Sequence, residues 1–308
     1  MQDQTIKPRL LLNFDLNGTL ILKDTSKKAS DEYMLISTLA ENTFAKWDER
    51  YEPMSFKQYV YNVLLPGDKS NVRLKKERQK IVATFLQWLS EKSHPAMGNV
   101  LDDYHKIKNK FTDSKTKEIN FTVFPSFYVM LEKLRNMKIP FIIILRTFGT
   151  DLPEVVKEIG DHDLGVKITH WAKFEDINFN TEGEKTIKKV EEIFDVFLSS
   201  DKHFAIQDDW LKWNQDGERG RSGKPFLYDI SGKGAIKNLS LFFDDNITGE
   251  EQDIVRPCEI AGKNAPTKSL CERLIFPVNT KEAMLNDDYY IDRILQAIRH
   301  SEATALIN

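Results

Sequence analysis

A short apolar run near the N-terminus, residues 10–14, constrains the fold more than any other feature of the sequence. The run ends abruptly at Asp15, and the turn-forming residues Asn17 and Gly18 follow closely. An apolar run of this length, bounded by turn residues, is typical of a strand that is buried on both faces of a parallel sheet. Parallel strands need crossover connections that cover the sheet, usually helices, so the run predicts an α/β fold.

Helical spacing replaces this pattern between residues 25 and 118. Apolar residues recur at intervals of three and four in successive stretches, which Pro53, Pro66 and Pro95 separate. Prolines in such places are typical of helix boundaries. The sequence therefore predicts a block of about four helices here, without a strand.

Strand patterns return after this block. A helical segment, residues 127–137, leads into a second apolar run at residues 141–145, and shorter apolar runs then alternate with helical stretches. This alternation predicts a doubly wound parallel sheet with helices on both faces. We expect an α/β core domain formed by residues 1–24 and 119–308, and an all-α domain, residues 25–118, inserted into it.

Polar residues stand directly after three of the predicted strands. Asp15 follows the first strand, and Arg146 and Thr147 follow the second. A later apolar run ends in Asp244 and Asp245. Ligands of open α/β sheets bind beyond the carboxyl ends of the strands, so these side chains are candidates for one common site.

The order of these residues resembles the four sequence motifs of the haloacid dehalogenase superfamily. Those motifs are an Asp-x-Asp-x-Thr strand end, a Thr or Ser after the next strand, a Lys that is often followed by Pro, and a late acidic pair. Lys224 is followed by Pro225 and precedes the acidic pair by twenty residues, where the third motif is expected. The resemblance spans residues 10–246, and it places the helical block where the family carries its cap.

The resemblance implies a Mg²⁺-dependent phosphatase that forms an aspartyl-phosphate on Asp15. The metal ligands that it implies are the Asp15 carboxylate, the backbone carbonyl of Asn17, and Asp244. Asp245 would be a further ligand or lie directly behind the others. Mg²⁺ prefers one or two carboxylates together with substrate oxygens and water, so these donors suit it.

Other residues are implied to contact the phosphoryl group. Thr147 would donate its hydroxyl and backbone amide, and Lys224 would neutralise phosphate charge and keep the nucleophile ionised. Arg146, beside Thr147, is a further candidate for substrate binding. Lys233 and Lys237 compete with Lys224 for its role.

Position 17 departs from the family pattern. Family phosphatases carry a second Asp there, which protonates the leaving oxygen and later activates water. Asn17 keeps a backbone carbonyl for the metal but cannot exchange a proton, which removes a contribution of about 10²–10⁴-fold to the rate. Either another group supplies the proton, or the leaving group departs unaided, as from an aryl phosphate or phosphotyrosine. The remaining alternative is a catalytically impaired protein that serves as a binding or scaffold module through its cap.

Three other features have a structural and a functional interpretation. Asp208 and Asp209 follow an apolar segment and could form an ordinary turn or the rim of the site. The basic segment 69–80 is expected to be a solvated helix face, or else a rim that attracts phosphorylated or membrane-surface partners. No histidine is assigned a role, although His170 and His203 would be the first to test for the missing acid.

The composition excludes several classes of protein. The net charge of −3 gives no sign of the basic domain that binds nucleic acid. No apolar run approaches the roughly 20 residues of a membrane helix, and no signal-peptide pattern is present. With only two cysteines, a disulfide framework is not expected. We therefore expect a cytoplasmic protein, with non-classical secretion left open, whose partner is a phosphorylated small molecule or a phosphoprotein.

Overall fold

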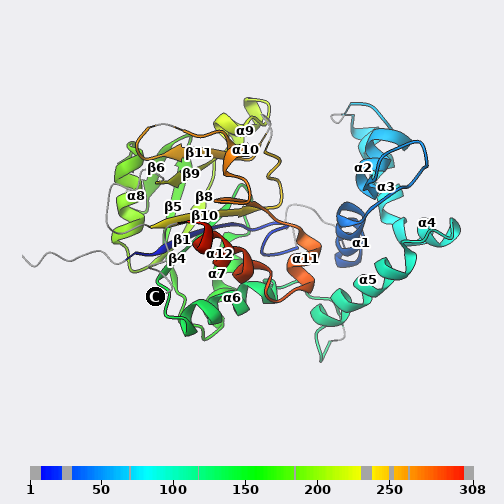
Figure 1. The fold of residues 1–308 in the computed structure, drawn as a ribbon, viewed down its shortest axis with the longest axis horizontal. Coiled ribbons are helices and arrows are strands. Elements are labelled where there is room, and N and C mark those ends of the chain that lie inside the picture. Colours follow the sequence, from blue (N-terminus) through cyan, green and yellow to red (C-terminus); the bar gives the residue numbers. More distant parts are fainter. Residues whose placement is uncertain are drawn as a thin grey trace, which may run out of the picture. The chain divides into compact units, whose positions relative to one another are not determined.

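The structure is a computed structural model, and it describes residues 8–22, 30–68, 71–116, 118–183, 185–229, 238–249, 253–262 and 264–301. The chain divides into two compact units, which Figure 1 shows in colours that follow the sequence. The first unit contains Met1–Ser26, Val123–Val278 and Asn286–Asn308. The second contains Lys27–Thr122 and Asn279–Leu285. The last of these segments was expected in the α/β domain, but it groups with the helical unit.

The first unit is built on an eight-stranded sheet with the order β12-β10-β1-β4-β8-β5-β6-β7. Neighbouring strands from β12 to β5 run parallel, whereas β6 and β7 add an antiparallel extension at one edge. A mixed α/β fold with a large, mostly parallel sheet is thus confirmed. The strands are β1 (Leu10–Asp15), β4 (Phe141–Thr147), β5 (Ile168–Glu175), β6 (Asn178–Thr181), β7 (Thr186–Ile187), β8 (His203–Gln207), β10 (Leu239–Asp244) and β12 (Ile275–Pro277).

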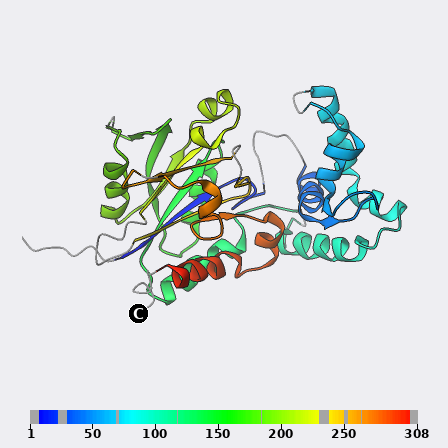
Figure 2. The same ribbon diagram turned by 45° about the horizontal axis from the view of Figure 1, so that its top comes forward.

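Both faces of the sheet are covered. On one face, the Phe14 ring lies edge-on against Phe127 of α6 (Pro125–Asn136) and Tyr290 of α12 (Tyr289–His300). In Figure 2 these two helices, green and red, lie on the same side of the sheet. The opposite face packs against α8 (Val190–Ser199) and a small parallel sheet. The two strands of that small sheet are β9 (Lys224–Tyr228) and β11 (Val255–Glu259).

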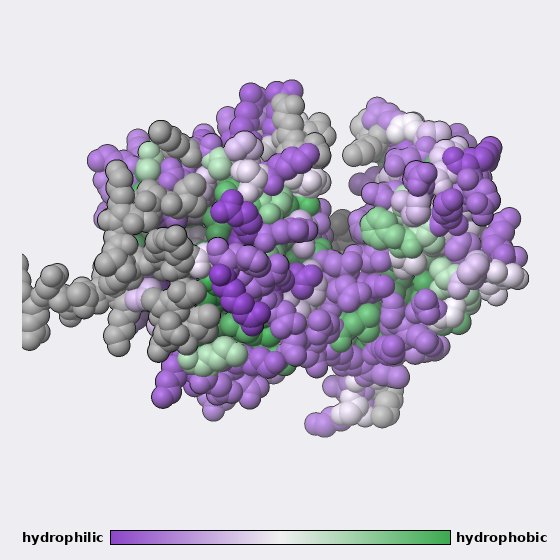
Figure 3. All heavy atoms as spheres, in the orientation of Figure 1, coloured by the Kyte–Doolittle hydropathy of each residue, from purple (hydrophilic) through white to green (hydrophobic). Residues whose placement is uncertain are grey.

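The remaining helices of this unit are short or lie beside the sheet. They are α7 (Leu152–Asp161), α9 (Trp210–Gln215), η2 (Gly220–Ser222) and α10 (Thr267–Leu270). Figure 3 shows one face of the molecule. Most of the described surface on this face is hydrophilic, with smaller hydrophobic areas among the hydrophilic residues. In the part of the chain that the structure describes, no helix combines the length and apolar character needed to span a membrane.

The strand order puts β1 at a topological switch point. The chain pairs β1 with β4 on one side and later returns to pair β10 with its other side, all three strands being parallel. In this register Asp15 lies opposite Arg146, and Phe14 lies opposite Phe243. The carboxyl ends of the three central strands therefore meet at one edge, where ligands of such sheets bind.

The second unit is mainly helical. Its elements are α1 (Asp31–Asn42), β2 (Phe44–Ala45), β3 (Met54–Ser55), α2 (Phe56–Tyr59), the π-helix η1 (Val60–Leu64), α3 (Val72–Ala83), α4 (Phe85–Glu91), α5 (Met97–Phe111) and α11 (Thr280–Leu285). The sequence predicted no strand in this block, and that prediction was wrong, because β2 and β3 pair antiparallel. Trp47, between these two strands, donates its indole N–H to the Met54 carbonyl at 2.7 Å and closes the connection between them.

Arg78 corrects the interpretation of the basic segment 69–80. Arg73, Lys75, Lys76 and Lys80 are exposed as expected, and Lys69 lies outside the described residues. Arg78, in contrast, is only 1% exposed, and its guanidinium donates to the carbonyls of Leu65 and Gly67 at 2.7–2.9 Å. These carbonyls belong to the segment that follows the C-terminal end of η1, so Arg78 joins this segment to α3.

We expect Arg78→Met to destabilise the helical unit. The substitution keeps an apolar stem but removes the hydrogen bonds to the Leu65 and Gly67 carbonyls, and a hydrogen bond to a charged group contributes about 1.5–3 kcal/mol. Urea denaturation measures the change in the free energy of unfolding. Arg73→Met is the matched control, because Arg73 is on the same helix, its side chain is 89% exposed, and it pairs with the partly exposed Glu77. Equal effects of the two substitutions would contradict the assigned role.

Candidate functional site

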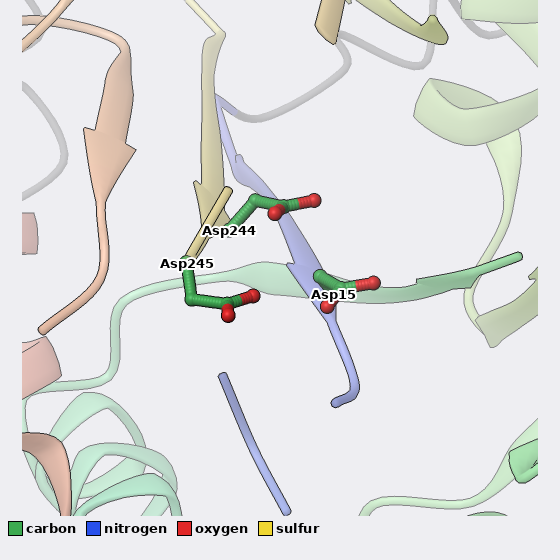
Figure 4. A group of neighbouring side chains, drawn as sticks. All are labelled: Asp15, Asp244 and Asp245. Atoms are coloured by element: carbon green, nitrogen blue, oxygen red, sulfur yellow. The ribbon is translucent and has the colours of Figure 1, made fainter. Parts of the chain in front are cut away.

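Three carboxylates converge at the carboxyl ends of the central strands. Asp15 ends β1, Asp244 ends β10, and Asp245 follows it (Figure 4). One carboxylate oxygen from each lies within 4.8 Å of those of the other two, and Asp15 and Asp244 are buried. Within the described ranges, this is the one such group of acidic, histidine or cysteine side chains that could hold a metal ion. Its donors are all oxygens, which suits a hard divalent cation such as Mg²⁺.

Lys224 lies between two of these carboxylates. Its Nζ donates to Asp15 Oδ1 at 2.5 Å and to Asp244 Oδ2 at 2.7 Å, and it is 1% exposed. Lys224 begins β9, and its backbone N–H donates to the Ile254 carbonyl at 2.7 Å, which fixes the start of the strand. The competing Lys233 and Lys237 lie outside the described residues. Within the described part of the chain, Lys224 is the lysine that contacts Asp15.

Burial and neighbouring charges change the pKa values of Asp15 and Lys224. Burial raises the pKa of Asp15 to about 7, with a further increase from Asp244 and an opposing effect of Lys224. Burial lowers the pKa of Lys224, but the carboxylates of Asp15, Asp244 and Asp208 outweigh it and hold that pKa above its ordinary value. A permanent cation thus faces two buried carboxylates. Further positive charge at the site would favour ionised Asp15.

The turn after β1 holds Asp245 in place. The Leu16 carbonyl accepts the N–H groups of Leu20 and Ile21, so the chain turns sharply after Asp15. Thr19 Oγ1 then accepts the Asp245 N–H at 3.1 Å. Gly18 has φ of +81°, and a β-carbon there would lie 2.3 Å from Asp245 Oδ2. Only glycine allows this close approach of the turn to the acidic pair.

We expect Gly18→Ala to weaken Mg²⁺ binding about 10–100-fold, because the new methyl group displaces Asp245. Isothermal titration with Mg²⁺ measures the affinity. Gly262→Ala is the matched control, since Gly262 also has φ of +81° but has no atom within 4 Å of its added β-carbon. Both variants carry the backbone strain, so a similar loss of Mg²⁺ affinity in both would contradict displacement of Asp245.

Thr147 occupies the predicted position at the end of β4. It is buried, and its hydroxyl oxygen accepts the Gly149 N–H at 2.8 Å. Its carbonyl accepts the Asp208 N–H at 2.8 Å, which joins the ends of β4 and β8. The hydroxyl is thereby oriented at the strand end, with its own hydrogen available as a donor.

Arg146 is not placed for substrate binding, which corrects the prediction. Its guanidinium donates to Asp208 through Nε at 3.1 Å and through a second nitrogen at 2.5 Å, and to the Pro225 carbonyl at 2.7 Å. The group is buried between the rings of Phe174 and Phe242. Arg146 therefore supports the strand that carries Lys224, and Asp208 is its counterion rather than part of a rim.

Asp209 and the two histidines are also structural. Asp209 caps α9 by accepting the Lys212 N–H at 3.0 Å. His203 starts β8 and accepts the Ile143 N–H at 2.9 Å, and burial lowers its pKa to about 4. His170 lies opposite Phe204 near the start of the same strand. Both histidines are thus toward the amino ends of the strands, away from Asp15.

Asp151 is a candidate that sequence reasoning missed. It is the residue before α7, it is 2% exposed, and its Oδ2 accepts a hydrogen bond from Asn17 Nδ2 at 3.0 Å. The Asn17 carboxamide oxygen is buried and has no hydrogen-bond partner among the described residues. The available signal was its place, four residues beyond Thr147 in the loop that follows β4.

Comparison of the chain with protein-family models, curated proteins and solved structures gives no match. The chain's own geometry is a mostly parallel sheet with Asp15, Lys224 and two further carboxylates at the carboxyl ends of its central strands.

Proposed function

We propose that the protein is a Mg²⁺-dependent phosphatase that acts through an aspartyl-phosphate on Asp15, as the resemblance to the haloacid dehalogenase superfamily implies. The contact of Lys224 with both Asp15 and Asp244 is the observation that carries the proposal. A buried lysine held at 2.5–2.7 Å from two carboxylates at a topological switch point is suited to anion chemistry. The helical unit would be the cap of such an enzyme.

Asp15 is suited to nucleophilic attack on phosphorus. One of its carboxylate oxygens forms the bond to phosphorus while the bond to the leaving oxygen breaks and that oxygen keeps the electron pair. Lys224 offsets the negative charge of the carboxylates and the phosphoryl group, and Thr147 donates to a phosphoryl oxygen. Water then releases phosphate from Asp15 in a second step.

The oxygen donors fit Mg²⁺, with Asp15, Asp244, Asp245 and the Asn17 carbonyl as its ligands. When bound, Mg²⁺ supplies positive charge between the carboxylates and the phosphate. The raised pKa of Asp15 is consistent with this fit, because burial and, to a lesser extent, Asp244 disfavour its ionised form, which a bound cation would favour.

Asn17 favours substrates whose leaving group departs without a proton. A phenol, with a pKa of about 10, is a far better leaving group than a sugar alcohol. An aryl phosphate or phosphotyrosine, in a small molecule or a phosphoprotein, is therefore the substrate class that suits the site. The test is release of phosphate from p-nitrophenyl phosphate by the full chain, with Mg²⁺ and after chelation.

The presence of Asn17 where the family carries an Asp also supports a second candidate function. If Asn17 abolishes turnover, the protein would be a binding or scaffold module that retains the pocket and contacts a partner through its helical unit. In that case a phosphate analogue binds but wild-type protein and Asp15→Asn are equally inert with saturating Mg²⁺. Turnover that depends on Asp15 excludes this candidate.

A further inference from the structure

The hydrogen bond between Asn17 and Asp151 brings a carboxylate to the position where the acid–base group is missing. Asn17 Nδ2 donates to Asp151 Oδ2 at 3.0 Å, and this contact fixes which end of the carboxamide faces Asp151. Asn17 Oδ1 is thereby left as a buried acceptor without a partner in the described chain. A buried acceptor of this kind requires a donor, such as water or a hydroxyl group.

Polar side-chain atoms of Asp151, Asn17 and Thr147 all lie close to Gly149. A β-carbon at Gly149 would lie 3.0 Å from Asp151 Oδ2, 3.2 Å from Asn17 Nδ2 and 3.3 Å from Thr147 Oγ1. Thr147 ends the strand beside β1, and Asn17 is two residues from Asp15. The Asp151 carboxylate thus belongs to the same cluster as the residues that are proposed to contact the phosphoryl group.

We infer that Asp151 supplies the general base that position 17 lacks, which rests on the proposed function. In the hydrolytic step, the oxygen of water bonds to phosphorus and the bond between phosphorus and Asp15 breaks. The electron pair of that bond returns to the Asp15 carboxylate. One proton of the water passes to the Asp151 carboxylate and from there to solvent. The other hydrogen stays on the oxygen that becomes part of the phosphate, and it forms a hydrogen bond to Asn17 Oδ1. The products are inorganic phosphate and regenerated Asp15.

Other described groups fit this role less well. Asp208 is paired with Arg146, and Asp244 and Asp245 belong to the proposed metal site. His170 and His203 lie toward the opposite ends of the strands. Asp151 contacts the side chain of Asn17, whereas the proposed metal ligand in that residue is its backbone carbonyl, so the two functions do not compete for one atom.

The first test uses the Asp151→Asn variant. The protein is mixed with p-nitrophenyl phosphate, and the amount of acid-stable or trapped phosphoenzyme is measured over time. A phenolate departs unaided, so we expect phosphoenzyme to form as in wild type. Its hydrolysis should slow by about 10²–10⁴-fold, and the phosphoenzyme should accumulate. Asp161→Asn, at the other end of α7 and exposed, is the matched control.

The second test returns the carboxylate to position 17. Asn17→Asp combined with Asp151→Asn keeps one amide and one carboxylate in contact, so it preserves the pair whatever the single variant does to folding. We expect the double variant to hydrolyse its phosphoenzyme at least tenfold faster than Asp151→Asn. Unfolding midpoints of the metal-free variants show whether the fold is retained.

The outcomes separate the inference from the function on which it rests. Wild-type hydrolysis of phosphoenzyme by Asp151→Asn would overturn the inference while leaving the proposed function intact. Equal slowing of phosphoenzyme formation and hydrolysis, with no recovery in the double variant, would also overturn it, because Asp151 would then only hold the site together. If wild type forms no phosphoenzyme, the proposed function itself fails.

Discussion

Asp15→Asn should abolish phosphoenzyme formation and reduce aryl phosphate hydrolysis by on the order of 10⁴-fold or more. The carboxamide keeps the size of the side chain and can still accept a hydrogen bond from Lys224, but it is not a nucleophile. The fold should tolerate the change, since ionising Asp15 in its buried site is itself unfavourable, as its pKa of about 7 shows. Stopped assays with p-nitrophenyl phosphate, together with unfolding midpoints, measure both effects.

Asp209→Asn is the control for this experiment. It makes the same chemical change at another strand end, and asparagine can still cap α9 as Asp209 does. We expect wild-type turnover from it. Phosphoenzyme on the Asp15→Asn variant would show that a different residue is the nucleophile.

Lys224→Met should have a large effect on both stability and activity. Lys224 is the buried cation that neutralises Asp15 and Asp244, and removal of one partner from a buried charge cluster costs about 3–5 kcal/mol. Turnover should fall about 10²–10³-fold, because a preorganised positive charge at the transferring group is lost. Denaturation in urea and the aryl phosphate assay measure the two losses.

The response of Lys224→Met to added Mg²⁺ tests whether its loss of stability arises at the carboxylate cluster. A divalent cation between the carboxylates offsets the repulsion that Lys224→Met exposes, so Mg²⁺ should raise the unfolding midpoint of the variant more than that of wild type. Lys173→Met is the control, because Lys173 pairs with Glu175 and both side chains are more than half exposed. An unfolding midpoint of Lys224→Met that does not respond to Mg²⁺ would argue against a metal site beside Asp15.

The central sheet was predictable because its strands are simple in sequence. The apolar runs that became β1 and β4 are buried along almost their whole length, and only a parallel sheet covered on both faces accommodates them. The antiparallel extension through β6 and β7 was not predicted. Its residues are largely half-buried or exposed, so they lack an apolar run that marks a strand.

The site was predictable to the extent that strand ends determine it. Asp15, Thr147 and Asp244 were expected at one edge of the sheet, and the parallel register places them there. Arg146 lies opposite Asp15 in the register, but its guanidinium is occupied by Asp208 and the Pro225 carbonyl. The sequence order alone did not reveal that Asp208, after β8, would pair with it.

Asp151 and Arg78 show what sequence patterns cannot provide. Asp151 reaches Asn17 through the course of a loop, and no periodic pattern fixes such a course. Arg78 lies within a run of basic residues that otherwise face solvent, and its guanidinium donates to the Leu65 and Gly67 carbonyls in the segment after the π-helix. The metal ion and the assignment to a family remain predictions.

The Tyr290 hydroxyl donates to the Thr19 carbonyl across 271 positions of sequence, and the buried tyrosine also packs on Phe14 and Phe243. The turn that carries Gly18 is made well before α12. During translation this turn therefore lacks the group that anchors it. The proposed reaction with phosphate esters should become possible in the nascent chain only after α12 has emerged and docked on the sheet.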